Sequence, residues 1–309
     1  MAFTMHSHSG QFCPGHAKDQ LEDIIKHAIS LGFKTMGLTE HMPRYQERDL
    51  YPEERDHPDP FGILTTRHEA YLVEAQRLQK RYESQIHIII AFEAEFIRPE
   101  YAAHVALLAE PPCVDYFIGS VHYVHGLPID YDRETYAAAV AASSRGGSEE
   151  GLYEDYYDLQ FDMFTALKPR VVGHFDLIRL MSEDPGRDVR RWDGVWERIV
   201  RNLKLAKEQG GLLECNTSAL RKGLDEPYPC WAIAEEWLKM GGRFTMSDDS
   251  HGIAHLATNY SRALTYLESL GVTELWTFRR TPHPGTPDRT RAKLEEVAVP
   301  LTEFRTSFP

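Results

Sequence analysis

Short apolar runs alternate with longer amphipathic segments along the 309-residue chain, and this alternation limits the folds that it can adopt. Residues 21–29 carry apolar side chains at the three- and four-residue spacing of a helix face. Residues 86–92 are apolar on both faces, as in a buried parallel strand. Roughly seven or eight such alternations predict a parallel sheet with helices outside it, closed or nearly closed into a barrel. A doubly wound open sheet is the alternative fold.

Residues of the types that bind metal ions follow these apolar runs. His6 and His8 lie at i and i+2 after the first run, so both imidazoles point the same way on an extended backbone. Glu93 and Glu95 share one face in the same manner. Since the strand ends of a (β/α) barrel meet at one mouth, we expect these side chains to converge there. The other candidates are His16, His41, His122, His174, Asp248, Asp249 and His251.

Any one of these histidines, taken alone, is better explained as a hydrogen-bonded histidine of the core or the rim. Seven of the fifteen lie at or just beyond strand ends, however, and together they favour a metal site. Imidazole and carboxylate ligands suit zinc, manganese or iron, and the lack of thiolates argues against a closed structural zinc site. More than four ligands imply two or three divalent ions. Such a site suits phosphate-ester hydrolysis by a metal-bound hydroxide.

The composition indicates one large domain, residues 1–309, of a soluble, cytoplasmic protein. The hydrophobic fraction is 42%, the mean hydropathy is -0.44, and no apolar stretch approaches the roughly 20 residues of a membrane span. A net charge of -13 disfavours binding to nucleic acid, so we expect a small-molecule partner and no membrane partner. The four cysteines (Cys13, Cys113, Cys215 and Cys230) form no C-x-x-C pair and predict free thiols. The oligomeric state stays open.

Three segments outside the alternation carry their own expectations. Residues 44–66 are polar and rich in proline, which predicts a long, lid-like loop before a helix over 67–82, with His57 and His68 in solvent. Residues 137–150 pass from alanines to serines and glycines, which predicts a flexible insertion. After the turn-rich residues 281–285, the tail is expected to be helical and then frayed.

Five short stretches combine into a specific pattern. They are Met5-His6-Ser7-His8, Leu38-Thr39-Glu40-His41-Met42-Pro43, Gly119-Ser120-Val121-His122, Gly173-His174-Phe175-Asp176-Leu177-Ile178-Arg179 and Glu214-Cys215-Asn216-Thr217. This pattern resembles the polymerase and histidinol phosphatase (PHP) superfamily, and within it the monofunctional histidinol-phosphate phosphatases. The similarity covers about residues 5 to 270.

The resemblance implies an α/β fold, a distorted (β/α)7 TIM-like barrel, with a trinuclear metal centre. The first ion would be held by His6, His8, Glu93 and Asp249. Glu93 would bridge to a second ion, held with His122 and His174. The third ion would be held by His16, His41 and His251. The implied reaction is the hydrolysis of L-histidinol phosphate to L-histidinol and phosphate, a late step of L-histidine biosynthesis. The expected catalytic residues are Glu93, Asp249 and His251.

A phosphate ester also calls for cationic side chains, and arginine matches phosphate oxygens bidentately. Arg179 follows the His174 strand end and Arg221 follows Asn216, so both are placed to reach the mouth. The resemblance supports both as substrate-binding residues, and a surface ion pair is the alternative for each. Asn216 either hydrogen-bonds the substrate or caps the following helix.

Three other functions fit parts of the pattern. A nuclease or nucleotide phosphatase could use the same metal scaffold, although the acidic charge argues against long nucleic acids. An amidohydrolase also begins with His-x-His, but its middle strand usually ends in a bridging lysine, where this chain has Glu93. A metal-binding or regulatory module without catalysis is the third alternative, and the apparently complete ligand set counts against it.

Overall fold

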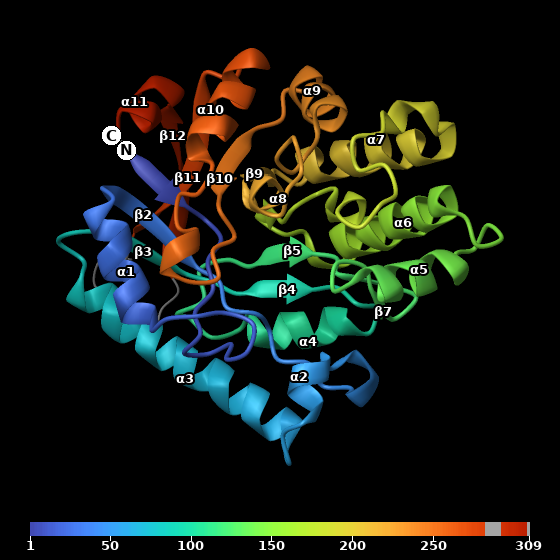
Figure 1. The fold of residues 1–309 in the computed structure, drawn as a ribbon. Helices are drawn as coiled ribbons and strands as arrows, with labels where there is room; N and C mark the ends of the chain where they lie inside the picture. Colours follow the sequence, from blue (N-terminus) through green and yellow to red (C-terminus); the bar gives the residue numbers. More distant parts are fainter. Residues whose placement is uncertain (282–291, 308–309) are drawn as a thin grey trace.

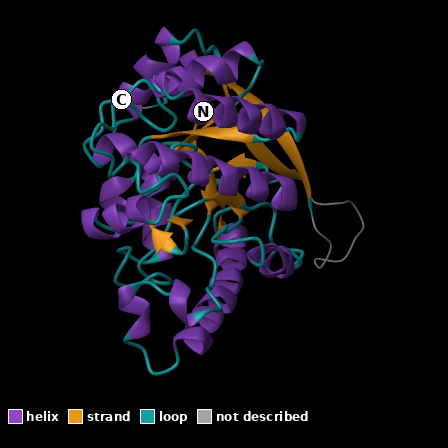
Figure 2. Cartoon of the chain, turned by 90° about the vertical axis from the view of Figure 1, so that its right-hand side faces the viewer, coloured by secondary structure: helices purple, strands orange, loops and turns teal. Residues whose placement is uncertain are grey.

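The structure, a computed structural model, describes residues 1–281 and 292–307 and shows parallel strands surrounded by helices (Figures 1 and 2). The helices are α1 (Leu21–Ser30), α2 (Pro52–Arg55), α3 (Pro60–Arg81), α4 (Tyr101–Leu108), α5 (Arg133–Ala141), α6 (Glu149–Leu167), α7 (Asp193–Glu208), α8 (Ser218–Arg221), α9 (Trp231–Lys239), α10 (Tyr260–Ser269) and α11 (Leu301–Thr306). Short 3-10 helices are η1 (Glu47–Asp49), η2 (Leu177–Arg179), η3 (Val189–Arg191) and η4 (Ile253–His255).

Two parallel sheets form the centre of the molecule, one of three strands in the order β1-β2-β3 and one of five in the order β10-β9-β8-β5-β4. Nearly all of their residues are buried, which explains the apolar runs and agrees with the predicted parallel sheet. The strands are β1 (Ala2–Thr4), β2 (Phe33–Leu38), β3 (His87–Ile90), β4 (Glu93–Glu95), β5 (Ile118–Ser120), β8 (Val171–Val172), β9 (Leu212–Asn216) and β10 (Phe244–Ser247).

Backbone hydrogen bonds also join the edges of the two sheets. Met5 N donates to Met246 O at 3.0 Å, so the chain leaving β1 runs beside β10. At the other edge, Glu93 N donates to Glu40 O at 3.0 Å and Met42 N donates to Glu93 O at 3.1 Å, so the chain leaving β2 runs beside β4. The carboxyl ends of the first, middle and last strands therefore lie together, which a doubly wound open sheet would not readily provide.

The segment expected to be a long loop is partly helical. Residues 44–66 contain η1, α2 and the first turns of α3. α3 begins early because Asp59 accepts a hydrogen bond from Gly62 N at 3.0 Å and Pro60 occupies the first helical position. The helix predicted over 67–82 thus begins at Pro60. The prediction that His68 is solvated is wrong, since its side chain is buried in α3, whereas His57 is exposed as predicted.

The expected flexible insertion at 137–150 is also partly helical. α5 extends to Ala141 and α6 begins at Glu149, so a short turn region separates them. Capping explains both helix starts: Asp132 accepts from Thr135 N at 2.7 Å, and Ser148 accepts from Gly151 N at 3.1 Å. Earlier in the chain, a short antiparallel pair, β6 (Tyr123–Val124) and β7 (Leu127–Pro128), follows His122.

The prediction of a helical tail is wrong for most of its described part. β12 (Lys293–Pro300) pairs antiparallel with β11 (Glu274–Thr281), and only the final α11 is helical. Residues 282–285 of the turn-rich segment lie outside the described residues. α11 packs beside β1, where the Phe3 and Phe304 ring centroids are 5.0 Å apart, so the two termini are adjacent in Figure 1.

All four cysteines are free, as predicted. Within the described ranges, no helix combines the length and apolarity needed to cross a membrane.

Candidate metal centre

The predicted histidines and acids converge at the carboxyl ends of the parallel strands. His6 and His8 follow β1, and their ring centroids are 4.9 Å apart. His41 follows β2 and stacks on His8 with a centroid separation of 4.1 Å. His122 follows β5 and His174 follows β8, and these two rings are 4.8 Å apart. The residues come from separate strands, so the parallel sheet itself assembles the cluster.

Glu93, at the start of β4, lies between two groups of imidazoles. Its Oε2 lies 3.4 Å from His6 Nε2 and 3.0 Å from His41 Nδ1. Its Oε1 lies 3.4 Å from His122 Nε2 and 3.0 Å from His174 Nε2. Oε2 also lies 3.6 Å from His8 Nε2. Each oxygen therefore faces its own group of rings, which is the arrangement expected of a carboxylate that bridges two ions.

Asp249 and His251 extend the cluster from the end of β10. Asp249 has a left-handed backbone with φ of 48°, and its Oδ1 lies 3.4 Å from His8 Nε2 and 3.7 Å from His6 Nε2. The His251 ring is 4.5 Å from that of His8 and 4.6 Å from that of His16. Asp248 points elsewhere, since its carboxylate accepts hydrogen bonds from buried backbone and side-chain donors: Thr4 Oγ1, Ser250 N, Ala257 N and Tyr260 OH.

Three triplets of candidate ligand atoms lie close enough together to hold ions, and they are His6/His8/Glu93, Glu93/His122/His174 and His8/His41/His251. The first contains three of the four residues expected to hold the first ion, without Asp249, and the second contains the three expected to hold the second ion. The third differs in one member, because His8 rather than His16 completes it. His16 remains nearby, with its ring 5.2 Å from that of His41.

The donor atoms of the cluster fit metal ions better than hydrogen bonds. Nε2 of His6 and both ring nitrogens of His8 are buried and make no hydrogen bond within residues 1–281 and 292–307. Carboxylate oxygens of Glu93 and Asp249 lie 3.4–3.7 Å from these Nε2 atoms. Two ligand atoms that are each about 2.1 Å from one tetrahedral ion lie about 3.4 Å apart. The observed spacing therefore leaves room for an ion between imidazole and carboxylate.

The pKa shifts of His8 and Glu93 suit metal binding. Burial by itself lowers the pKa values of His6, His41 and His122, but the neighbouring carboxylates raise them, so a bound cation would displace protons from these rings. Burial and the neighbouring His41 ring lower the pKa of His8 to about 3, so its imidazole is neutral near pH 7 and can ligate a cation. Burial by itself raises the pKa of Glu93, but the facing imidazoles of His6 and His122 hold that pKa well below its ordinary value. The cluster thus offers a neutral ring and an ionised carboxylate as donors.

Glu214 is a buried acid that the sequence analysis did not assign. Its Oε1 lies 2.9 Å from His6 Nδ1 and accepts from Ser247 Oγ at 2.8 Å. Its Oε2 accepts from His174 N at 3.0 Å and Asn216 Nδ2 at 3.1 Å. Glu214 therefore orients His6 so that Nε2 faces the cluster, which is the usual way in which an outer carboxylate fixes a ligand histidine. The sequence did contain one signal for this role, a single glutamate within the otherwise apolar residues 212–215.

Arg44 connects the cluster to the segment expected as a lid. Its guanidinium pairs with Glu95 at 2.7 Å and with Glu54 of α2 at 2.5 Å, and it lies 4.2 Å above the Tyr51 ring. Glu95 in turn lies 3.4 Å from His41 Nδ1. Glu95 thus faces both a buried arginine and the cluster, in contrast to Glu93, which faces imidazoles with both oxygens.

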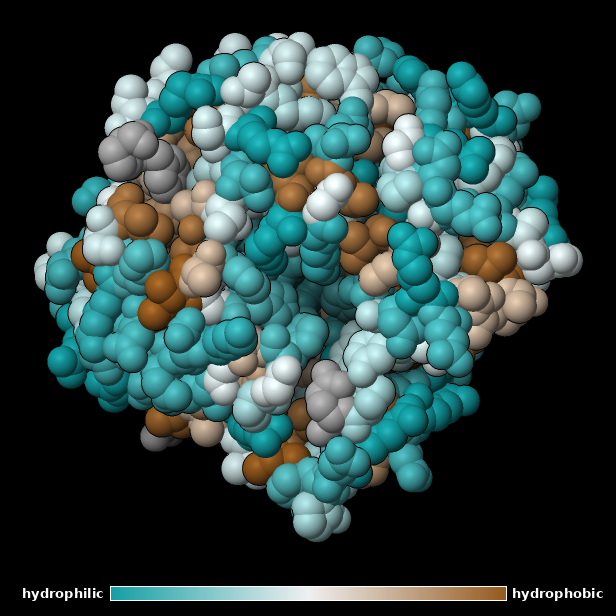
Figure 3. All heavy atoms as spheres, viewed as in Figure 1, coloured by the Kyte–Doolittle hydropathy of each residue, from teal (hydrophilic) through white to brown (hydrophobic). Residues whose placement is uncertain are grey.

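A cavity of about 430 Å³ adjoins the cluster. Figure 3 shows a mostly hydrophilic face that is hollowed near its centre. Arg221 lines the cavity, and its guanidinium donates to the carbonyl oxygens of Asp248 and Asp249, at 2.7 Å each. Beyond the predicted residues, the lining includes Tyr51, Asp130, Tyr131, Leu177, Lys222 and His255.

The other two predicted substrate-binding residues do not line this cavity. Arg179 is buried and donates to Asp176 Oδ2 at 2.8 Å, Glu226 O at 2.9 Å and Pro227 O at 2.6 Å. Asn216 Oδ1 accepts from Ser218 N, the first residue of α8, at 2.9 Å. The geometry favours a structural role for Arg179 and helix capping for Asn216 over contact with a substrate.

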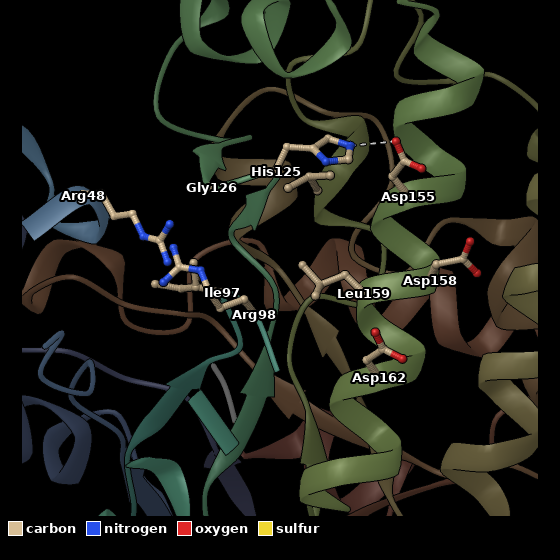
Figure 4. A pocket seen from close by; sticks show the side chains of 10 residues that line it. Arg48, Ile97, Arg98, His125, Gly126, Asp155, Asp158, Leu159 and Asp162 are labelled. Carbon is tan, nitrogen blue, oxygen red and sulfur yellow. Dashed lines mark hydrogen bonds and ion pairs between the residues drawn. The ribbon is translucent and has the colours of Figure 1, made fainter. Parts of the chain in front are cut away.

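A second cleft lies apart from the cluster (Figure 4). Arg48 and Arg98 stand on one side, and three aspartates of α6 stand on the other. Most of these charges already have partners: Arg98 pairs with Asp49, and Asp155 accepts from His125 at 2.7 Å. The cleft lacks the converging imidazoles of the metal centre, so the 430 Å³ cavity is the better candidate for the active site.

The fold and the cluster together define a class: α/β proteins whose metal ligands gather at the carboxyl ends of parallel strands. The PHP domain family matches residues 4–218, which is most of the chain, and the protein belongs to this family, as its sequence motifs predicted. Members of the family are metal-dependent.

Curated relatives and solved structures agree with this membership. The chain is 42% identical to the probable histidinol-phosphatase of Schizosaccharomyces pombe, over 91% of each chain. It is 32% identical to the histidinol-phosphatase of Saccharomyces cerevisiae, over 85% of this chain and 87% of that one.

The crystal structure of a putative histidinol phosphatase from Listeria monocytogenes has a TM-score of 0.72 at 24% identity, covering 84% of this chain and 99% of that one. That of a histidinol phosphate phosphatase from Lactococcus lactis, complexed with zinc, L-histidinol and phosphate, has a TM-score of 0.66 at 18% identity, covering 89% and 96%. These two structures support the α/β fold.

Proposed function

We propose that the protein is a metal-dependent phosphomonoesterase that hydrolyses L-histidinol phosphate to L-histidinol and phosphate. The position of Glu93, with each carboxylate oxygen facing a separate group of imidazoles, carries this proposal. The names of its relatives support the choice of substrate, since those from both yeasts are histidinol-phosphatases.

We propose that two or three divalent ions of zinc, manganese or iron occupy the cluster. His6, His8, Glu93 and Asp249 would hold one, and Glu93, His122 and His174 a second. His41 and His251, with His8 or His16, would hold the third. Ions at these positions would acidify a water molecule and neutralise charge on the phosphoryl oxygens.

The side chains of the chain would complete the reaction. Water adds its oxygen to phosphorus, the bond from phosphorus to the ester oxygen breaks, and the alcohol oxygen of histidinol takes up a proton. Asp249 borders the cavity and would help to hold the ion that acidifies this water. His251 Nδ1 lies 3.0 Å from the carbonyl oxygen of Asp249 and helps to fix that residue. Arg221 would orient the phosphate at the cavity wall.

We further propose that the two sheets form one distorted (β/α)7 barrel. The hydrogen bonds between Met5 and Met246 and between Glu93 and Glu40 support closure at both edges. β3 and β4 are separated by only Ala91 and Phe92, so they would act as one barrel strand.

Phosphate release from a panel of esters tests the proposed function. The panel contains L-histidinol phosphate, adenosine monophosphate and glucose 6-phosphate, each assayed before and after chelation. We expect strong preference for L-histidinol phosphate, loss of activity on chelation, and recovery with added Mn²⁺ or Zn²⁺. Equal or faster hydrolysis of the nucleotide would favour the nucleotide-phosphatase alternative. No release from any ester by the metal-loaded protein would refute phosphatase activity altogether.

A further inference from the structure

One carboxylate of the cavity, that of Asp130, pairs with no imidazole in the described part of the chain. Glu93 and Asp249, the other acids of the lining, each lie within 4 Å of at least two imidazoles. Asp130 is only partly buried, and within residues 1–281 and 292–307 no hydrogen bond or ion pair joins its side chain to another residue. A half-buried charge without a partner loses part of its hydration and gains nothing in exchange. A cationic ligand group would restore that balance.

The backbone holds Asp130 next to the metal centre. The antiparallel pair β6 and β7 turns the chain back toward His122, and Ile129 N donates to His122 O at 2.9 Å. Asp130 is the next residue, so its position is tied to a predicted metal ligand. Asp130 lines the same cavity as His16 and His122, which follow different strands.

The other walls of the cavity have a different character. Arg221 and Lys222, at the end of α8, supply positive charge for a phosphate. Tyr131 follows Asp130 and is 44% exposed, and its ring is 22° from parallel to that of Tyr51 at 6.1 Å. Aromatic faces next to a carboxylate favour an organic cation. The lining therefore offers cationic side chains for an anion and a carboxylate for a cation.

We propose that Asp130 determines substrate specificity by binding the ammonium group of the phosphate ester, an inference that rests on the proposed function. In L-histidinol phosphate the ammonium is on the carbon next to the one that bears the ester oxygen. Binding both charged groups fixes which way the ester enters the cavity. Nucleotides and sugar phosphates lack this ammonium, so Asp130 selects against them.

The test compares two esters on one variant, Asp130→Asn. The second ester is 3-(imidazol-4-yl)propyl phosphate, which keeps the imidazole and the phosphate and lacks the amine. For L-histidinol phosphate we expect kcat/KM to fall about ten- to a hundredfold, mainly through KM, because a hydrogen bond to a charged group is lost. For the amine-free ester we expect kcat/KM to stay within about twofold of the unmodified protein. The metal content should not change, since Asp130 belongs to none of the three ligand triplets described above.

A matched control is Asp162→Asn, which removes an exposed carboxylate of the second cleft (Figure 4) and should leave both esters unaffected. Equal losses on both esters, or no loss on L-histidinol phosphate, would overturn the role of Asp130 while leaving the phosphatase assignment intact. If the unmodified, metal-loaded protein does not hydrolyse L-histidinol phosphate, the proposed function and this inference fall together.

Discussion

Glu214→Gln is the substitution that most directly tests how the protein positions its cluster. Each carboxylate oxygen of Glu214 serves two polar groups, His6 and Ser247 on one side and His174 and Asn216 on the other. Glutamine replaces one oxygen with an NH₂ group, so two buried donors lose their acceptor in either amide orientation. Each unmet buried donor costs about 1–3 kcal/mol, so we predict a loss of about 2–6 kcal/mol in the free energy of unfolding.

Metal affinity should fall as well, because His6 loses the group that fixes its tautomer. Loss of such an outer carboxylate typically lowers metal affinity or activity about 10- to 100-fold. Denaturant unfolding, metal analysis after dialysis and phosphate release measure the three effects. Glu235→Gln, on the exposed face of α9, is the control and should change stability by no more than about 0.5 kcal/mol. A Glu214→Gln protein with unchanged stability, metal content and rate would refute the reasoning.

Three further substitutions probe separate parts of the site. Glu93→Gln should abolish phosphate release and lower the bound metal together, because this one residue faces two groups of imidazoles; full activity would contradict the bridging role. Arg221→Ala should raise KM about tenfold with a smaller fall in kcat, since the side chain borders the cavity and also holds the carbonyl of Asp249; an effect on kcat alone would argue against phosphate binding. Arg44→Met should lower the free energy of unfolding by about 3–5 kcal/mol by leaving Glu95 without its cation, and adding Glu95→Gln should restore part of it; an unchanged denaturation midpoint would contradict this.

The positions of the metal-ligand candidates were predictable because they depend on local rules. A ligand directly after an apolar strand ends up at the carboxyl edge of a parallel sheet, whatever the lengths of the connecting helices. His6, His41, His122 and His174 all follow this rule. Glu93 was also separable from Glu95 by its place in the motif. In the structure both acids lie near His41 and His122, but Glu95 also pairs with Arg44, whereas Glu93 lies beside His6 and His174.

Features that depend on pairing between distant segments were not predictable in the same way. β12 carries no clear alternation of buried and exposed residues, and it is a strand because it pairs with β11. His68 has a polar sequence neighbourhood, but its helix packs it under the Phe92 ring, at a centroid distance of 5.9 Å. Arg179 lies at the expected strand end, yet buried carbonyls of residues 226 and 227 occupy its donors. Nothing in the local sequence reveals such partners.

Metal analysis of the purified protein, combined with anomalous diffraction at the zinc, manganese and iron edges, tests the central claim most directly. The account predicts two or three ions, with Glu93 between two of them and activity that disappears when they are removed and returns when they are restored. A protein that binds no divalent ion at these side chains under saturating conditions, or that hydrolyses its ester equally well without any, would contradict the account.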